Sequence, residues 1–148
     1  MWINQQGTSP ETAALLSNQN FRQALNYGFD RSATVNAVNP GYKAYNRLVD
    51  SNFAGPDGGK FVDEYPVETV PLSGDVDKAK EYLAAAMEEL GYSDVSQLPQ
   101  LELITWDTSE QKLLLETIID QWKQNLGLEN IQLTQYVIGT AIGSFYDL

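Results

Sequence analysis

Two carboxylates come closest to a pattern that could carry out chemistry. Asp107 and Glu110 directly follow an apolar stretch that ends at Trp106. Open α/β sheets bind ligands where strands lead into helices, so the two side chains are candidates for the acid–base pair of a small hydrolase. Such a hydrolase would need burial to keep one carboxyl protonated while the other ionises. Capping is the simpler interpretation, because the helix dipole favours acidic residues in a first turn.

The composition excludes most other catalytic chemistries. The 148 residues include no His and no Cys, which removes the imidazole base, the thiolate nucleophile and the usual nitrogen and sulfur ligands of a metal. The sequence also has no Gly-x-Ser-x-Gly nucleophile motif, no glycine-rich phosphate loop and no calcium loop. We therefore predict a protein that is not an enzyme and that uses no metal and no cofactor.

The charge balance excludes a further class of partner. The 20 acidic and 9 basic side chains give a net charge of −11, which repels phosphate backbones, so nucleic acid is not an expected partner. No apolar run reaches the ~20 residues that span a bilayer, so the sequence predicts no membrane-spanning helix. An apolar content of 43% is sufficient for one globular domain over residues 1–148.

Hydrophobic periodicity predicts an α/β fold. The expected elements are a short strand at residues 1–4, helices at 18–28, 30–38, 75–90 and 110–126, and strands at 101–106 and 131–137. The strand, helix and strand between residues 101 and 137 form a βαβ unit, which implies a parallel pair of strands. Thr108 and Gln111 have the spacing of a capping box at the start of the last helix.

One long segment has no regular pattern. Residues 41–74 are rich in Gly and Pro, which predicts an irregular path over the surface. The segment also carries aromatic side chains that predict packing against the rest of the domain, namely Tyr42, Tyr45, Phe53, Phe61 and Tyr65. Three further aromatic residues, Trp2, Trp106 and Tyr136, could line a groove for an extended ligand, although core packing explains each of them equally well.

One stretch resembles a known family. Residues 20–31 read NFRQALNYGFDR and resemble the "vRqAlsyaiDR" stretch of the oligopeptide- and dipeptide-binding proteins of ABC importers, which are family 5 of the extracytoplasmic solute-binding proteins. Further similar features follow in the family's order: an upstream strand that ends at Asn4, the Asp-x-x-Lys-Ala-Lys-x-x-Leu helix from Asp75, the WKQNLGL stretch at 122–128, and FYDL at 145–148. Together these features cover nearly the whole chain.

The resemblance implies a fold and a function. It implies a periplasmic-binding-protein-like lobe, with a βαβ unit in a parallel or mixed sheet flanked by helices. The chain would be most of the C-terminal lobe of a larger two-lobe protein, and the absence of a polar tail around Met1 and Leu148 also predicts a fragment. Such a protein binds extended peptides between its lobes and delivers them to an ABC permease. It lies outside the cytoplasm, either as an extracellular membrane-anchored lipoprotein or in the periplasm. The resemblance therefore implies membrane contact only through an anchor outside this chain.

The resemblance also implies which residues bind the ligand. The family's cleft-facing positions match Asn4, Tyr45, Trp106, Asp107 and Thr108. The family's Trp-x-x-Asp-Tyr-x-x-Pro segment, whose Asp often pairs with the α-ammonium of the peptide, would follow Leu148, so no residue here takes that role. The charged residues of the best-matching stretch are expected to cap or connect helices. Two alternatives stay open: the small hydrolase described above, and a lobe that binds a non-peptide solute such as a sugar or a nickel complex.

Overall fold

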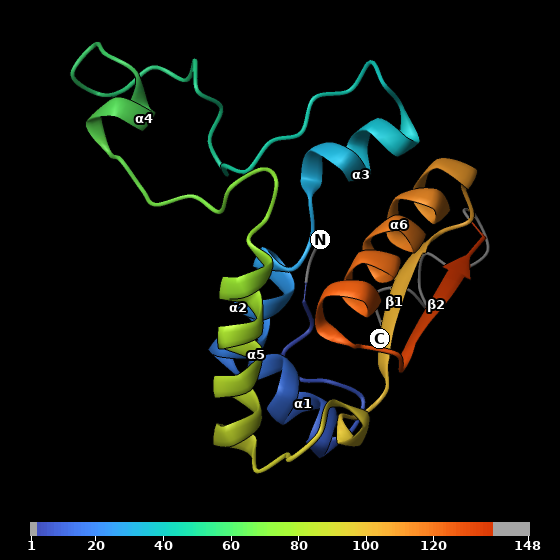
Figure 1. Ribbon diagram of the computed structural model, residues 1–148. Helices are drawn as coiled ribbons and strands as arrows, with labels where there is room; N and C mark the ends of the chain where they lie inside the picture. The colour runs from blue at the N-terminus through green and yellow to red at the C-terminus, as the bar shows by residue number, and fades with distance from the viewer. Residues whose placement is uncertain (1–2, 138–148) are drawn as a thin grey trace.

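A computed structural model describes residues 3–137 of the chain (Figure 1). Its elements in order are α1 (Pro10–Ser17), α2 (Gln19–Tyr27), α3 (Arg31–Val38), α4 (Phe61–Glu64), α5 (Val76–Leu90), a 3₁₀ turn (Val95–Gln97), β1 (Leu101–Trp106), α6 (Ser109–Leu126) and β2 (Ile131–Tyr136). Helices α1, α2 and α5 gather on one side, and α6 lies between them and the two strands, with α3 beside it. Within the described residues, no helix is long and apolar enough to cross a membrane.

The two strands form the predicted βαβ unit. They pair in parallel, with Leu101 opposite Ile131 and Trp106 opposite Tyr136, and α6 connects them. Side chains alternate between the two faces of a strand, and the alternate positions Leu101 and Thr105 are both buried. The sheet therefore places the carboxyl ends of both strands at one edge, which is also the edge where α6 begins.

Local sequence signals fix where the longer helices start and stop. A side-chain oxygen accepts a hydrogen bond from a backbone N–H in the first turn of α1, α2, α3, α5 and α6, and these capping residues are Ser9, Asn18, Asp30, Asp75 and Thr108. Helices α5 and α6 end at Gly91 and Gly127, which adopt left-handed φ values of 78° and 70°. Glycine takes this conformation without the strain that a Cβ would add.

The core lies where α2, α5 and α6 meet. Small residues stand at the contact between α2 and α5, and Ala24, Ala79 and Ala86 have no exposed surface. Alanines at a helix contact allow close approach of the two backbones. Trp122 of α6 is 1% exposed, and its indole N–H donates to the Leu25 carbonyl over 2.9 Å. This bond pairs one of the carbonyls that the end of α2 leaves without a partner inside the helix.

A second set of hydrogen bonds attaches α6 to the turn between α2 and α3. The Gln121 side chain accepts from the Asp30 backbone N–H over 2.7 Å and donates to the Thr34 hydroxyl over 2.8 Å. Thr34 is 1% exposed, and its own hydroxyl donates to the Asp30 carbonyl. Asn125 donates to the Gly28 carbonyl over 2.9 Å. Helix α6 is thus held by apolar packing and by directed polar bonds.

The start of the chain differs from the prediction. Ile3 and Asn4 lie in irregular chain and not in a strand, and residues 1–2 are outside the described residues. Helix α1 was not predicted, because PETAALLS has a continuous apolar run without helical spacing. Ser9 caps α1 and Pro10 occupies its first turn, where the missing N–H of proline costs nothing. The family-like FYDL stretch at 145–148 also lies outside the described residues.

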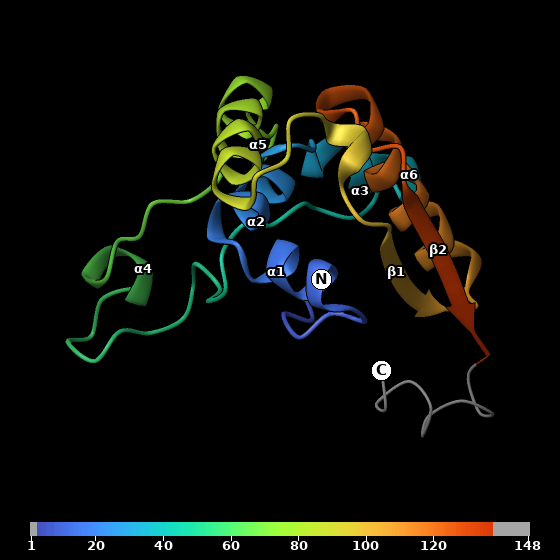
Figure 2. The same ribbon diagram turned by 90° about the horizontal axis from the view of Figure 1, so that it is seen from below.

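The irregular segment extends from the body of the molecule as an arm. Both views show residues between α3 and α5 running away from the other helices, with α4 at the far end (Figures 1 and 2). The predicted lack of regular structure is confirmed, apart from α4 and one bridge between Ala54 and Lys60. The prediction that its aromatic residues pack on the domain is wrong for Phe53 and Tyr65, which are 61% and 51% exposed. Phe61 contacts both rings, so these aromatic residues pack on one another.

Candidate ligand-binding site

The carboxyl end of β1 brings three of the predicted site residues together. Trp106 is the half-buried last residue of the strand. Asp107 is exposed, and its backbone N–H donates to the Tyr136 carbonyl over 3.0 Å, which extends the strand pairing by one residue. The Thr108 hydroxyl accepts from the Gln111 backbone N–H over 3.3 Å and caps α6. The turn therefore presents an indole, a carboxylate and a capped helix start side by side.

The Gln111 side chain fixes this turn in a way that the sequence did not predict. Its oxygen accepts from the Thr105 hydroxyl over 2.9 Å and from the Trp106 backbone N–H over 3.2 Å. Only the Thr108 half of the expected capping box is present, because the Gln111 side chain turns to the strand. The Trp106 N–H points away from β2, and a backbone donor needs an acceptor. Gln111 supplies it and joins the end of β1 to the first turn of α6.

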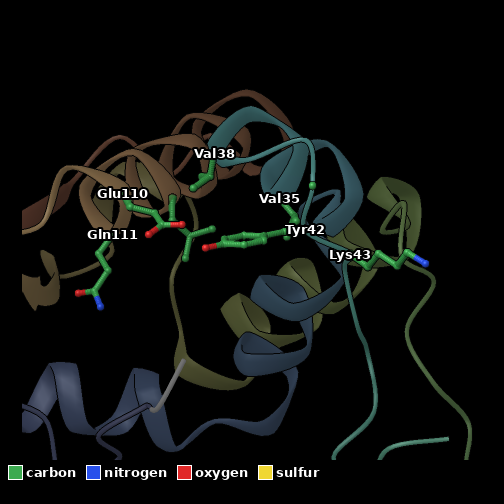
Figure 3. Close-up of a pocket in the computed structure, with 8 residues that line it drawn as sticks. Val35, Val38, Tyr42, Lys43, Glu110 and Gln111 are labelled. Atoms are coloured by element: carbon green, nitrogen blue, oxygen red, sulfur yellow. The ribbon is translucent and has the colours of Figure 1, made fainter.

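A hollow of about 630 Å³ lies beside this turn, between α3, the start of the arm and α6 (Figure 3). This volume is within the range of small-ligand sites. Its lining residues are Val35, Val38, Gly41, Tyr42, Lys43, Glu110, Gln111 and Leu114. Figure 3 shows the Tyr42 hydroxyl directed toward the Glu110 carboxylate, whereas the Lys43 side chain points away. The hollow thus combines apolar walls, a phenol and one inward carboxylate.

The five predicted site residues lie on three separate segments. Asn4 precedes α1, and its side-chain oxygen accepts from the Gln6 backbone N–H over 3.0 Å. Tyr45 lies in the arm, is 45% exposed, and donates its hydroxyl to the Val49 carbonyl. The other three form the turn after β1. None of the five lines the hollow, although Gln111 connects the hollow with that turn.

The hydrolase interpretation requires buried carboxyls, and the structure has none at this position. Asp107 and Glu110 are both exposed, and only Glu110 lines the hollow. Among residues 3–137, no group of three acidic side chains is placed so that it could hold a metal ion. The groups present at this position offer hydrogen bonds, apolar contact and charge to a ligand.

Most residues of the hollow were missed by the sequence analysis. Val35 and Val38 were assigned to their helix, and Tyr42 to the irregular segment, but nothing predicted that they would meet Leu114 across a gap. The i, i+3 spacing of the two valines beside Pro40 and Gly41 is a weak signal that such a gap exists. Contacts between elements this distant in the sequence are not encoded in any local pattern.

The charged residues of the stretch at 20–31 have structural roles, as predicted. Arg22 donates to the carbonyls of Leu16 and Ser17 at the end of α1, over 3.0 and 2.6 Å. Arg31 donates to the Asn26 carbonyl and side chain, and its guanidinium lies 4.5 Å from the centre of the Phe29 ring. Burial lowers the pKa of Arg31. These arginines connect helices.

Comparison with known proteins decides the family. The family model for bacterial extracellular solute-binding proteins, family 5 Middle, matches residues 1–136. The chain belongs to this family. A curated relative of this family 5 chain, the oligopeptide-binding protein OppA of Bacillus subtilis, is 31% identical over 114 residues. That alignment covers 77% of the chain and 20% of the relative, so the chain spans about a fifth of the relative's length.

Solved structures show the same fold. Listeria monocytogenes OppA bound to peptide matches 83% of the family 5 chain and 23% of its own, with a TM-score of 0.66 and 24% identity. A periplasmic oligopeptide-binding protein of Borrelia burgdorferi matches 94% and 24%, with the same TM-score and identity. The pheromone receptor PrgZ matches 98% and 26%, with a TM-score of 0.59. These matches confirm the α/β, periplasmic-binding-protein-like lobe, and each of these proteins is named for binding and not for catalysis.

Proposed function

We propose that this chain is part of the peptide-binding component of an ABC importer, and that it forms one of two lobes that enclose an extended peptide. The observation that carries the proposal is the family 5 match over residues 1–136, together with 31% identity to part of an oligopeptide-binding protein that is nearly four times as long. The partners that follow are a peptide, a second lobe and a membrane permease. Calorimetric titration with a sugar and with a nickel complex detects a ligand other than a peptide.

The turn after β1 is the proposed centre of peptide contact on this lobe. Trp106 offers an indole, and the exposed Asp107 and the half-buried Thr108 offer polar groups at the edge of the sheet where α/β proteins bind ligands. Tyr45 and Asn4 are the proposed outer contacts. Recognition through hydrogen bonds to the peptide backbone, some of them through water, accepts many different side chains.

Binding in this proposal depends on closure. A single lobe leaves one side of the peptide in water, where hydrogen bonds and charge pairs are weak. When a second lobe closes, it adds contacts and excludes water, and the closed form is the one that a permease recognises. No bond is made or broken, so the proposed role is not enzymatic. The protein would act outside the cytoplasm, either anchored by a lipid or free in a periplasm.

Isothermal titration calorimetry tests the proposal. The complete gene product that contains these residues and the 148-residue chain are each titrated with tri-, tetra- and pentapeptides, a sugar and a nickel complex. We expect the complete protein to bind a peptide with micromolar or tighter affinity and the chain alone to bind weakly or not at all. Micromolar binding by the chain alone would contradict the need for closure. Binding of only the sugar or the nickel complex would contradict the peptide.

A pair of variants tests the contact residues. Trp106→Ala in the complete protein should weaken peptide binding about tenfold or more, because an aromatic contact at the centre of an interface is removed. The control is Leu113→Ala, an exposed residue on α6 that does not line the turn. Melting temperatures show whether either variant is destabilised. Equal peptide affinities of the two folded variants would show that Trp106 does not contact the peptide.

A further inference from the structure

The hollow beside the proposed peptide site has a composition that selects a particular side chain. Its walls are apolar, with Val35 and Val38 from α3 on one side and Leu114 from α6 on the other. Tyr42 extends between them as a flat aromatic surface, and its hydroxyl is directed toward the Glu110 carboxylate (Figure 3). An apolar channel that ends in a single negative charge fits a group with an alkyl stem and a cationic head.

The charges around the hollow favour a cation over an anion. The lining residues include two charged side chains, Glu110 and Lys43, and Lys43 points away from the opening. Lys112, on the same helix turn, lies 3.7 Å from Glu116, which partly neutralises it. The start of α6 contributes only about half a positive charge. The full negative charge of Glu110 therefore outweighs the partial positive charge at the start of α6.

The position of the hollow connects it with the peptide path. Gln111 lines the hollow and also accepts from the Trp106 N–H at the end of β1. In the proposed function a peptide lies across Trp106, Asp107 and Thr108, so Gln111 joins the path of that peptide to the hollow. The volume of about 630 Å³ exceeds that of any single side chain. A cationic head can thus keep part of its hydration water, which reduces the cost of desolvation.

We infer that this hollow is a subsite for the basic side chain of a bound peptide, with Glu110 as the counter-ion of its ammonium group and Tyr42 as the surface for its stem. The inference rests on the proposed function and adds to it a preference for peptides that carry a basic side chain at one position. The face of Tyr42 attracts a cation through its ring quadrupole as well as through apolar contact. A lysine side chain at one peptide position is the committed occupant.

Calorimetry on the complete gene product tests the inference. The peptides are Ala-Ala-Ala and three series in which Lys, norleucine or Glu replaces each Ala in turn. At one position we expect Lys to bind about fivefold more tightly than norleucine, which has a similar stem without the charge, and Glu to bind more weakly than either. Equal affinity of Lys and norleucine at every position would overturn the inference, since charge recognition would then be absent.

Three variants locate the effect. Glu110→Gln should abolish the preference for Lys over norleucine, whereas Tyr42→Ala should weaken binding of both the Lys and the norleucine peptides. The matched control is Asp120→Asn, which removes an exposed carboxylate of α6 outside the hollow. A Lys preference that survives Glu110→Gln, or that Asp120→Asn also abolishes, would overturn the assignment. Failure of every peptide to bind would instead contradict the proposed function itself.

Discussion

Replacement of Trp122 by Phe tests how α6 is attached to the helical part of the lobe. The indole N–H donates to the Leu25 carbonyl over 2.9 Å in a site that is 1% exposed. Phe at position 122 would keep an aromatic ring near Phe29, whose ring centre lies 6.2 Å from that of the Trp122 indole in an edge-to-face contact. The Phe side chain has no hydrogen-bond donor. The carbonyl at the end of α2 would then be buried without a partner.

The magnitude follows from two losses. A buried carbonyl that loses its hydrogen bond costs about 1–2 kcal/mol, and the smaller ring leaves a partial cavity worth about 1 kcal/mol. We therefore expect Trp122→Phe to lower the free energy of unfolding by about 2–3 kcal/mol. Leu113→Ala, an exposed position on the same helix, should change it by less than about 0.5 kcal/mol.

Urea denaturation followed by far-UV circular dichroism measures both variants without relying on tryptophan fluorescence. An unchanged m value would show that the midpoint shift reports stability and not a change in the unfolded state. A loss of less than about 1 kcal/mol for Trp122→Phe would refute the reasoning, because neither the hydrogen bond nor the filled space would then hold α6 to α2.

Three further predictions concern single positions. Gly74→Ala should lower the melting temperature far more than Gly91→Ala, because both glycines have positive φ but a Cβ at Gly74 would lie 2.6 Å from the Phe29 carbonyl oxygen, whereas the space at Gly91 is open. Hydrogen bonds from the Ser96 side chain and backbone lower the pKa of Asp94 below its ordinary value of 3.8. Their stabilising effect is therefore present above pH 3.8 and is lost as the pH falls through the lowered pKa, and Asp94→Asn should flatten this part of a pH–stability profile. Gln111→Leu should accelerate amide hydrogen exchange at Trp106, because its N–H loses its acceptor.

The sequence predicted the parts of the fold that depend on local signals. Thr108 was recognised as a cap because an N-cap is defined by one side chain and the next three residues. Helix α1 was missed because its apolar residues are consecutive, and periodicity alone does not identify such a run. The aromatic residues of the arm were assigned to the body, but Phe61 and Tyr65 stack at 4.9 Å instead, which no pattern of spacing reveals.

The site was predicted less completely than the fold. The end of β1 at Trp106 was visible as the end of an apolar run. The assignment of residues 106–108 to the ligand site came from the family resemblance and stays a prediction. The hollow was not found, because Tyr42 and Leu114 are more than seventy residues apart and meet only after α3 and α6 pack. The stretch at 20–31 indicated the family, yet its arginines hold helices together and contact no part of the hollow.

The two ends of α6 have different attachments, and this has a mechanical consequence. At its start Gln111 joins it to β1, and near its end Trp122 and Asn125 join it to the α2 region. An 18-residue helix is about 27 Å long. Because α6 is stiff, a displacement of the sheet edge at β1 is transmitted along α6 to the α2 region. We therefore expect the residues outside the arm to move as one rigid unit, and any bending to occur within the arm.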